Sequence, residues 1–170
     1  MNLFIVSGAP NTGKSTTVYH LCTYLLNLGY VKTDIPYNGK RYSTSTSFPP
    51  ILANDFSCLL EKEGKKVLIH TATDDVFNID ALVNSINNHK PSIVITTCRD
   101  FGDWPRDYFC SQLKLVNSFI LASTSDIDIE EFPLSRITRR TTRFATAYEW
   151  YFINSTHQIE KILSLPPYRI

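Results

Sequence analysis

The chain has 170 residues and 43% of them are hydrophobic, which suits a single domain over residues 1–170 with a packed core. Charged residues make up only 19% and the formal net charge is +1, so the composition excludes a disordered chain and argues against a general nucleic-acid or anionic-membrane surface. The four cysteines form no CxxC pair or zinc-type cluster, and no apolar stretch approaches the ~18 residues of a membrane span, so we expect reduced thiols in a cytoplasmic protein without a membrane partner.

The first predicted elements are a strand over residues 3–7 and a helix over residues 14–28. The strand is a continuous apolar run that ends at a glycine turn, as expected of a central strand buried on both faces. The helix has apolar side chains at helical spacing, and Gly29 follows it as a stop signal. The chain therefore opens with a strand, a glycine-containing loop and a helix.

Residues 34–50 are polar and aromatic, with prolines and a Ser/Thr cluster, and we predict a loop with little regular structure there. Such a loop is either a binding loop or a mobile one. A strand pair over 56–60 and 66–71 is expected around a turn at Glu63 and Gly64, and a helix over 79–87 follows it.

The remaining predicted elements are strands over 93–95, 119–121 and 148–153 and helices over 104–116 and 158–163. The last strand is dense in aromatic residues, and the polar run Asn154-Ser155-Thr156 is interpreted as the cap of the closing helix, which Pro166 and Pro167 end. Strands and helices that alternate in this way predict an α/β domain with a mainly parallel sheet.

The most informative motif lies between the first strand and the first helix, where residues 8–15 read G-A-P-N-T-G-K-S and fit G-x-x-x-x-G-K-[ST] at every fixed position. Glycine lets the backbone N–H groups approach phosphate closely, and the helix that follows adds its N-terminal dipole. We predict that Lys14 reaches the β- and γ-phosphates and that the Ser15 hydroxyl coordinates Mg²⁺. The predicted binding residues for Mg-ATP are Gly8, Ala9, Pro10, Asn11, Thr12, Gly13, Lys14, Ser15 and Thr16.

Carboxylates and an arginine follow two later strands. Asp74 and Asp75 come after the strand over 66–71, and they are either helix N-cap residues or metal ligands, with Asp74 the predicted ligand. Arg99 follows the strand over 93–95, at an end where open α/β sheets bind ligands, and it either grips an anion or pairs with a neighbouring aspartate, Asp100 or Asp103. His70 is interpreted as a packed histidine.

Four arginines are spaced as on one face of a helix: Arg136, Arg139, Arg140 and Arg143. Arginines that reach a transferring phosphoryl group stabilise its transition state, so Arg139 and Arg143 join Lys14 and Arg99 as predicted catalytic residues. The alternative is a solvated face paired with the acidic residues Asp126, Asp128, Glu130 and Glu131 just upstream.

In their order these parts resemble the nucleoside and nucleotide kinase group of P-loop proteins. The residues that carry the resemblance are the 8–15 motif, the strand end Thr97-Cys98-Arg99-Asp100, the arginine-rich stretch 136–143, and residues 149–154. It implies a three-layer αβα sandwich with a mainly parallel five-stranded sheet, a lid-like arginine-rich segment at 126–147, and Asn154 near the donor base. Members of the group usually carry an aspartate near the position of Thr97 or Cys98. Here Asp34, Asp55 or Asp100 would have to supply that carboxylate.

Three functions remain open. The first is a small-molecule phosphotransferase that moves the γ-phosphoryl group of Mg-ATP to a nucleoside, nucleotide or similar small acceptor. The second is an NTPase or nucleotide switch that acts with a protein partner, and the third is a module that holds ATP without chemistry. ATP is favoured over GTP because the chain has no [NT]-K-x-D base-reading motif.

Overall fold

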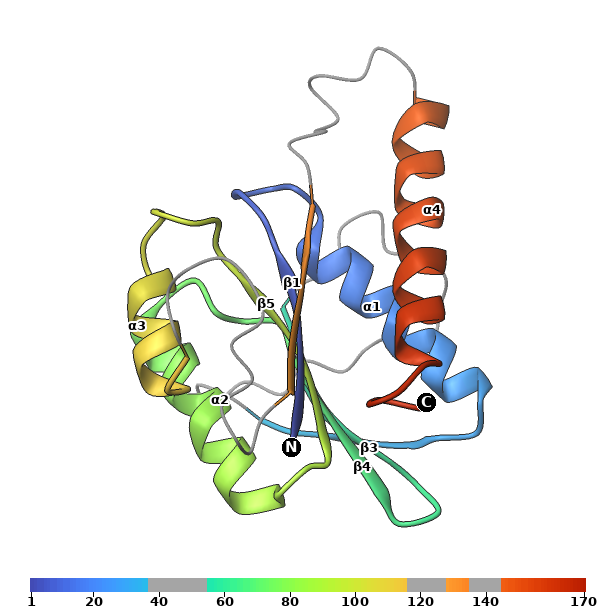
Figure 1. Ribbon diagram of the computed structural model, residues 1–170, viewed down its shortest axis with the longest axis horizontal. Coiled ribbons are helices and arrows are strands. Elements are labelled where there is room, and N and C mark those ends of the chain that lie inside the picture. The colour runs from blue at the N-terminus through green and yellow to red at the C-terminus, as the bar shows by residue number, and fades with distance from the viewer. Residues whose placement is uncertain (37–54, 116–127, 135–144) are drawn as a thin grey trace.

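The structure, a computed structural model, describes residues 1–36, 55–115, 128–134 and 145–170. In these ranges the chain forms a six-stranded mixed sheet and four helices (Figure 1). The strands are β1 (Asn2–Ser7), β2 (Val31–Asp34), β3 (Ser57–Lys62), β4 (Lys65–His70), β5 (Ile93–Cys98) and β6 (Asp128–Pro133). The helices are α1 (Lys14–Asn27), α2 (Val76–His89), α3 (Arg106–Gln112) and α4 (Ala145–Leu163).

The sheet has the strand order β2-β3-β4-β5-β1-β6. Strands β4, β5, β1 and β6 are parallel, whereas β3 runs antiparallel to both β4 and β2. The last residue of β1, Ser7, lies level with Cys98 of β5 and Pro133 of β6. One edge of the sheet therefore gathers the carboxyl ends of the parallel strands together with the beginning of β3, and we call it the carboxyl edge.

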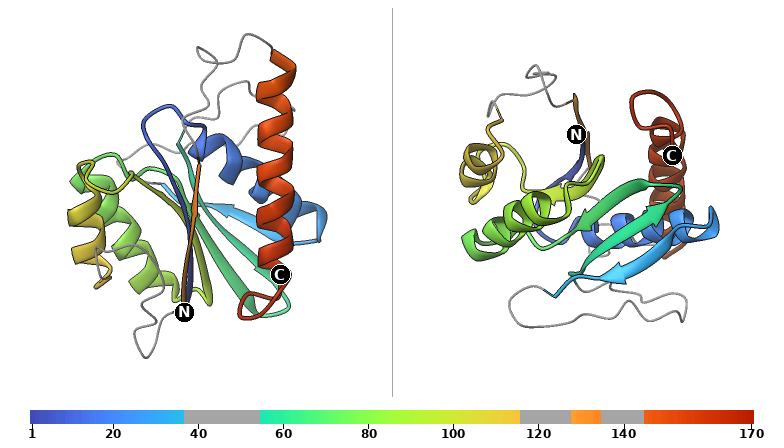
Figure 2. Two further views of the ribbon diagram at one scale, coloured as in Figure 1. Left: turned by 45° about the horizontal axis from the view of Figure 1, so that its top comes forward. Right: turned by 90° about the horizontal axis from the view of Figure 1, so that it is seen from below.

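Helices cover both faces of the sheet (Figures 1 and 2). Successive strand residues point to opposite faces, so each strand contributes to two separate cores. On one face, α1 and α4 pack over a core that includes Phe4, Val6, Ile69 and Ile95. On the other face, α2 and α3 pack over a core that includes Leu3, Ile5, Leu68 and Val94.

The α/β prediction is confirmed, but the mainly parallel five-stranded sheet is not, because the sheet has six strands and is only partly parallel. The two strands that the sequence analysis did not predict, β2 and β6, lie at the two edges of the sheet. Edge strands need only a weak apolar pattern. In β2 exposed and half-buried residues alternate, and β6 contains three carboxylates.

The predicted strand over 148–153 and the predicted cap at 154–156 are wrong, because both stretches belong to the continuous helix α4. Aromatic enrichment favours strands only weakly, and burial of a helical face overrides it. Ile159 and Leu163, four residues apart, are fully buried in the core that α4 shares with α1. The helix ends at Leu163, before the two prolines.

The other predicted helices are confirmed with shifted bounds, and three predictions, including the arginine-rich stretch 136–143, fall on parts of the chain that are not described. The strand predicted over 119–121 lies outside the described residues, as does all of the polar loop at 34–50 after residue 36. Within the arginine-rich segment at 126–147, residues 128–133 form β6 and α4 begins at residue 145. In the described ranges no helix is both long enough and apolar enough to cross a bilayer.

Candidate functional site at the carboxyl edge

The loop from β1 to α1 is folded tightly and requires glycine at its first position. Gly8 N donates a hydrogen bond to Cys98 O (3.2 Å), and the Thr12 hydroxyl donates to Ala9 O (2.9 Å). A Cβ atom at residue 8 would lie only 2.6 Å from Thr12 Oγ1 and 3.2 Å from Leu134 O. Because real side chains do not approach so closely, only glycine fits this turn without displacing the loop or the end of β6.

The loop ends at the N-terminus of α1, which is left open toward the carboxyl edge. Gly13, with φ 91°, is the N-cap residue of α1. Among the described residues no side chain accepts a hydrogen bond from the first N–H groups of this helix. Thr17 N donates to Gly13 O (2.9 Å), so the N–H groups of Lys14, Ser15 and Thr16 precede the hydrogen-bond ladder of the helix. Open N–H groups and the helix dipole together favour an anion at this position.

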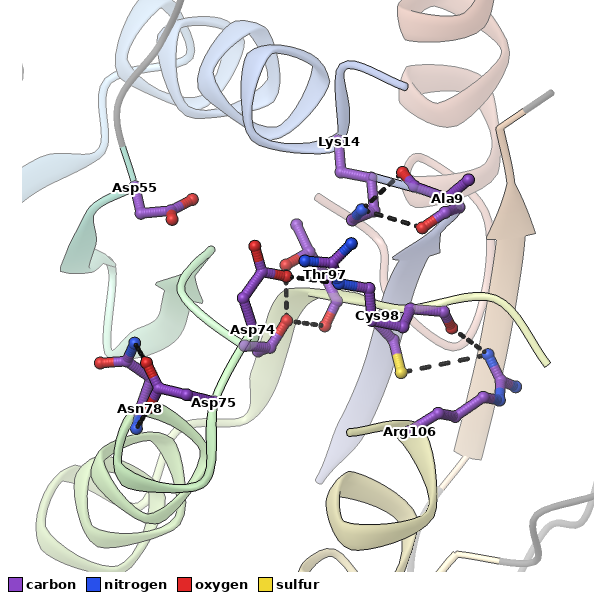
Figure 3. A network of polar contacts seen from close by, with 12 residues as sticks. Ala9, Lys14, Asp55, Asp74, Asp75, Asn78, Thr97, Cys98 and Arg106 are labelled. Carbon is purple, nitrogen blue, oxygen red and sulfur yellow. Dashed lines mark hydrogen bonds and ion pairs between the residues drawn. The ribbon is translucent and has the colours of Figure 1, made fainter. Parts of the chain in front are cut away.

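Lys14 is turned back onto the loop that precedes it (Figure 3). Its side chain is buried, and Nζ donates hydrogen bonds to Gly8 O (2.8 Å) and Ala9 O (3.0 Å). Burial lowers the pKa of Lys14, an effect that the nearby charge of Asp74 opposes. The ammonium group therefore ties the first turn of α1 to the preceding loop, and an anion bound on the loop would compete with these carbonyl contacts.

Ser15 faces a carboxylate that comes from a distant part of the chain. Its hydroxyl donates a 2.7 Å hydrogen bond to Oδ1 of Asp55, which directly precedes β3 at the carboxyl edge. Burial raises the pKa of Asp55; the hydrogen bond from Ser15 lowers it, and the charge of Asp74 raises it. From the sequence, Asp55 is only one of three candidate carboxylates, since no local pattern indicates a contact across 40 residues.

The two aspartates after β4 have different roles. Asp75 is the N-cap of α2: its Oδ1 accepts from Asn78 N (2.9 Å) and its Oδ2 from Asn78 Nδ2 (2.7 Å). Asp74 instead forms an ion pair with Arg99, with 2.8 Å between Oδ1 and Nε, although Nε is not aligned for a hydrogen bond. The cap interpretation is therefore confirmed for Asp75. The partner of Arg99 is Asp74, which replaces both Asp100 and Asp103 as predicted partners.

A second arginine, Arg106 at the start of α3, links the turn after β5 to β6, and the sequence did not predict this role. Its guanidinium makes two 2.7 Å hydrogen bonds to the carboxylate of Glu131 in β6, and Nη1 also donates to Arg99 O (2.9 Å). The bidentate hydrogen bonds to Glu131 raise the pKa of Arg106 above its ordinary value. Glu131 is one of the acidic residues that were expected, as an alternative, to pair with the arginine-rich stretch; in the structure its partner is Arg106.

Threonines connect the carboxyl ends of β4 and β5. The Thr97 hydroxyl donates to Thr71 O (2.7 Å), and the Thr73 hydroxyl donates to Thr97 O (3.0 Å). His70 is fully buried, as predicted, with 2.8 Å between Nε2 and Ala72 O, and burial lowers its pKa to about 4. The two threonine hydrogen bonds link the end of β5 to the residues that follow β4.

The remaining predicted residues do not join this cluster. Asn154 is exposed on α4, and the turn that suggested its contact with a base is not formed. Arg139 and Arg143 lie outside the described residues, so their role remains a prediction. Within the described ranges, no three His, Cys, Asp or Glu side chains form a group that could hold a metal ion by themselves.

Comparisons with known proteins returned no relatives. No protein-family model matches the chain, and neither a curated protein nor a solved structure matches it. The geometry at the carboxyl edge therefore carries the functional conclusion.

Proposed function

We propose that the protein is a P-loop phosphotransferase that binds Mg-ATP at the 8–16 loop and transfers the γ-phosphoryl group to a small acceptor. One observation carries the proposal: the G-x-x-x-x-G-K-S motif lies between a buried strand and an open helix N-terminus. Within it, Gly8 has no room for a side chain, and the Lys14 ammonium lies against the loop carbonyls. This combination of backbone donors and a buried cation suits a polyphosphate.

The residues around the loop fit the nucleotide and its metal. The Ser15 hydroxyl and the carboxylates of Asp55 and Asp74 are hard oxygen donors, which Mg²⁺ prefers, and Mg²⁺ needs only one or two protein ligands besides phosphate. When bound, the ion would neutralise part of the negative charge of the phosphates. Lys14 would contact the same phosphates, and Arg99 would stabilise negative charge that develops during transfer or grip the acceptor.

The second candidate function is an NTPase or nucleotide switch that acts with a protein partner. Two observations favour it. Thr97, in β5, has no carboxylate that could act as a base, and its hydroxyl donates a hydrogen bond to Thr71 O directly after β4. In addition, large aromatic side chains are exposed in the first turn of α2, Phe77 (73%), and in the turn after β5, Phe101 (56%) and Trp104 (69%). Exposed apolar groups beside a site are a common feature of partner surfaces.

ADP formation from Mg-ATP separates these functions. The purified full chain would be assayed without an acceptor and with nucleosides, nucleoside monophosphates, small sugars and small acids. Lys14→Ala tests the site, and Lys161→Ala, which removes an exposed lysine near the end of α4, is the matched control.

A kinase shows ADP formation that depends on one class of acceptor, that Lys14→Ala abolishes and that Lys161→Ala leaves unchanged. ATP binding without any acceptor dependence favours the partner-dependent switch. If ATP does not bind, or if Lys14→Ala has no effect on binding or turnover, the proposal is wrong.

A further inference from the structure

We propose that Asp55 is the carboxylate that works with Ser15 on the magnesium ion of the bound nucleotide, and that Asp74 is reserved for Arg99. This inference rests on the proposed Mg-ATP site. It chooses between two carboxylates at the carboxyl edge, Asp55 and Asp74, whose charges both act on Lys14, and it differs from the assignment of Asp74 that the sequence suggests. Because Asp55 acts through the Ser15 hydroxyl, it is a positioning residue.

The reversed direction of β3 brings Asp55 to the site. Strand β3 pairs antiparallel with β4, and Ser57 lies opposite His70, so the residues before β3 lie at the same edge as the residues after β4. From there the Asp55 carboxylate reaches α1 and accepts the 2.7 Å hydrogen bond from Ser15. Figure 3 shows Asp55, Asp74 and Lys14 around one region at this edge.

The hydrogen bond between Ser15 and Asp55 prepares the hydroxyl oxygen for a cation. A serine hydroxyl has one proton and two lone pairs. Since the proton is directed at Asp55, the lone pairs point away from the carboxylate and remain available. The hydrogen bond therefore survives when the oxygen ligates a cation, and the negative charge behind it makes the oxygen a better donor, as with other ligands that are bonded to carboxylates.

Asp74 is less suited to the same task because it already has a cationic partner. Its Oδ1 lies 2.8 Å from Arg99 Nε, and the two side chains are 53% and 16% exposed, respectively. If Asp74 moved to a metal ion, the largely buried guanidinium of Arg99 would lose its counter-charge, which is costly. The positive charge of Arg99 also weakens the attraction of Asp74 for a second cation. Among the described residues, Asp55 forms no ion pair that it would have to give up.

The test measures how strongly Mg²⁺ improves nucleotide binding, and not turnover. ATP with a fluorescent N-methylanthraniloyl group is titrated into the full chain in excess Mg²⁺ and in EDTA, and the ratio of the two dissociation constants is compared. We expect Asp55→Asn to lower this ratio by about 10–100-fold, the usual cost of losing a carboxylate behind a metal ligand. Its affinity in EDTA should stay at the wild-type value. Asp74→Asn tests the competing assignment, and Asp75→Asn, which keeps an N-cap side chain on α2, is the matched control whose ratio should not change.

A double-variant comparison distinguishes action through Ser15 from a general change of charge. On a Ser15→Ala background, Asp55→Asn should cause no further loss in the ratio, because the hydroxyl that it orients is gone. Thermal unfolding of each variant checks the fold. If Asp55→Asn does not fold, Asp55→Glu takes its place, since it keeps the charge but displaces it by one methylene, and the same loss of ratio is expected.

The outcomes separate this inference from the proposed function. An unchanged ratio in the folded Asp55 variant, or a loss confined to Asp74→Asn, overturns the assignment while nucleotide binding itself stands. Additive losses on the Ser15→Ala background show that Asp55 does not act through Ser15. If the wild-type chain binds the nucleotide in neither condition, the proposed function and this inference fail together.

Discussion

Replacing Arg106 by methionine should destabilise the fold strongly, although this residue lies outside the 8–16 loop. The side chains of Arg106 and Glu131 are only 8% and 22% exposed, and two 2.7 Å hydrogen bonds join them between α3 and β6. Arg106 also donates to Arg99 O, which holds the turn after β5. Removal of the guanidinium therefore leaves a largely buried carboxylate and a carbonyl oxygen without their donor.

The expected loss is about 3–5 kcal/mol of unfolding free energy, the usual cost of leaving one half of a buried ion pair. Glu131→Met should cost a similar amount, because it leaves the guanidinium as the uncompensated charge. The double variant Arg106→Met/Glu131→Met removes both charges and should lie within about 2 kcal/mol of the wild type, since apolar side chains of similar volume often replace a buried pair at little cost.

Urea unfolding followed by circular dichroism gives the free energies, and the double variant also tests the site. If it is stable but forms less ADP than the wild type, the pair positions Arg99 as well as stabilising the fold. A loss below about 1 kcal/mol for both single variants would place the pair in the range of exposed ion pairs and would refute the reasoning.

Three further predictions concern the loop, the cap of α2 and the buried histidine. Gly8→Ala should weaken Mg-ATP binding by at least about tenfold, because its Cβ would lie 2.6 Å from Thr12 Oγ1, whereas Gly64→Ala, with nothing within 4 Å, should not change binding. Asp75→Ala should lower the unfolding free energy by about 1 kcal/mol without changing the affinity for Mg-ATP, since this residue caps α2. His70 is neutral when folded and has a pKa of about 4, below its unfolded value, so its contribution is present above the unfolded pKa and is lost as the pH falls. Unfolding free energy should drop by about 2 kcal/mol from pH 7 to pH 5, and a His70→Gln variant that kept the full slope would contradict this.

The sequence predicts correctly those parts of the fold whose residues are close together in the chain. The 8–15 motif, its buried strand and its helix lie next to one another in the chain, so local pattern defines all three. Gly8 and Gly13 adopt the positive φ angles that the tight loop requires. The same reasoning predicted α2 but began it three residues late, because the capping role of Asp75 could not be separated from that of Asp74.

The sequence does not predict contacts between residues that are far apart in the chain. The bond from Ser15 to Asp55 spans 40 residues and that from Arg106 to Glu131 spans 25, and neither pair has a spacing that a pattern could reveal. Strand β6 contains three carboxylates, so its place beside β1 depends on the sheet rather than on an apolar run of its own. In the same way, the aromatic run at 148–153 favours a strand locally, while the helix that continues to Leu163 fixes its conformation.

Because β3 runs antiparallel to β4, the hairpin that joins them lies at the end of the sheet away from the candidate site. The hairpin between β3 and β4 turns at Glu63 and Gly64, at the edge opposite the 8–16 loop (Figure 1). A Cβ on Gly64 would meet nothing within 4 Å. An affinity tag or a surface anchor attached at this turn would leave the carboxyl edge open to solvent, so the molecule could be immobilised in a defined orientation with the site accessible.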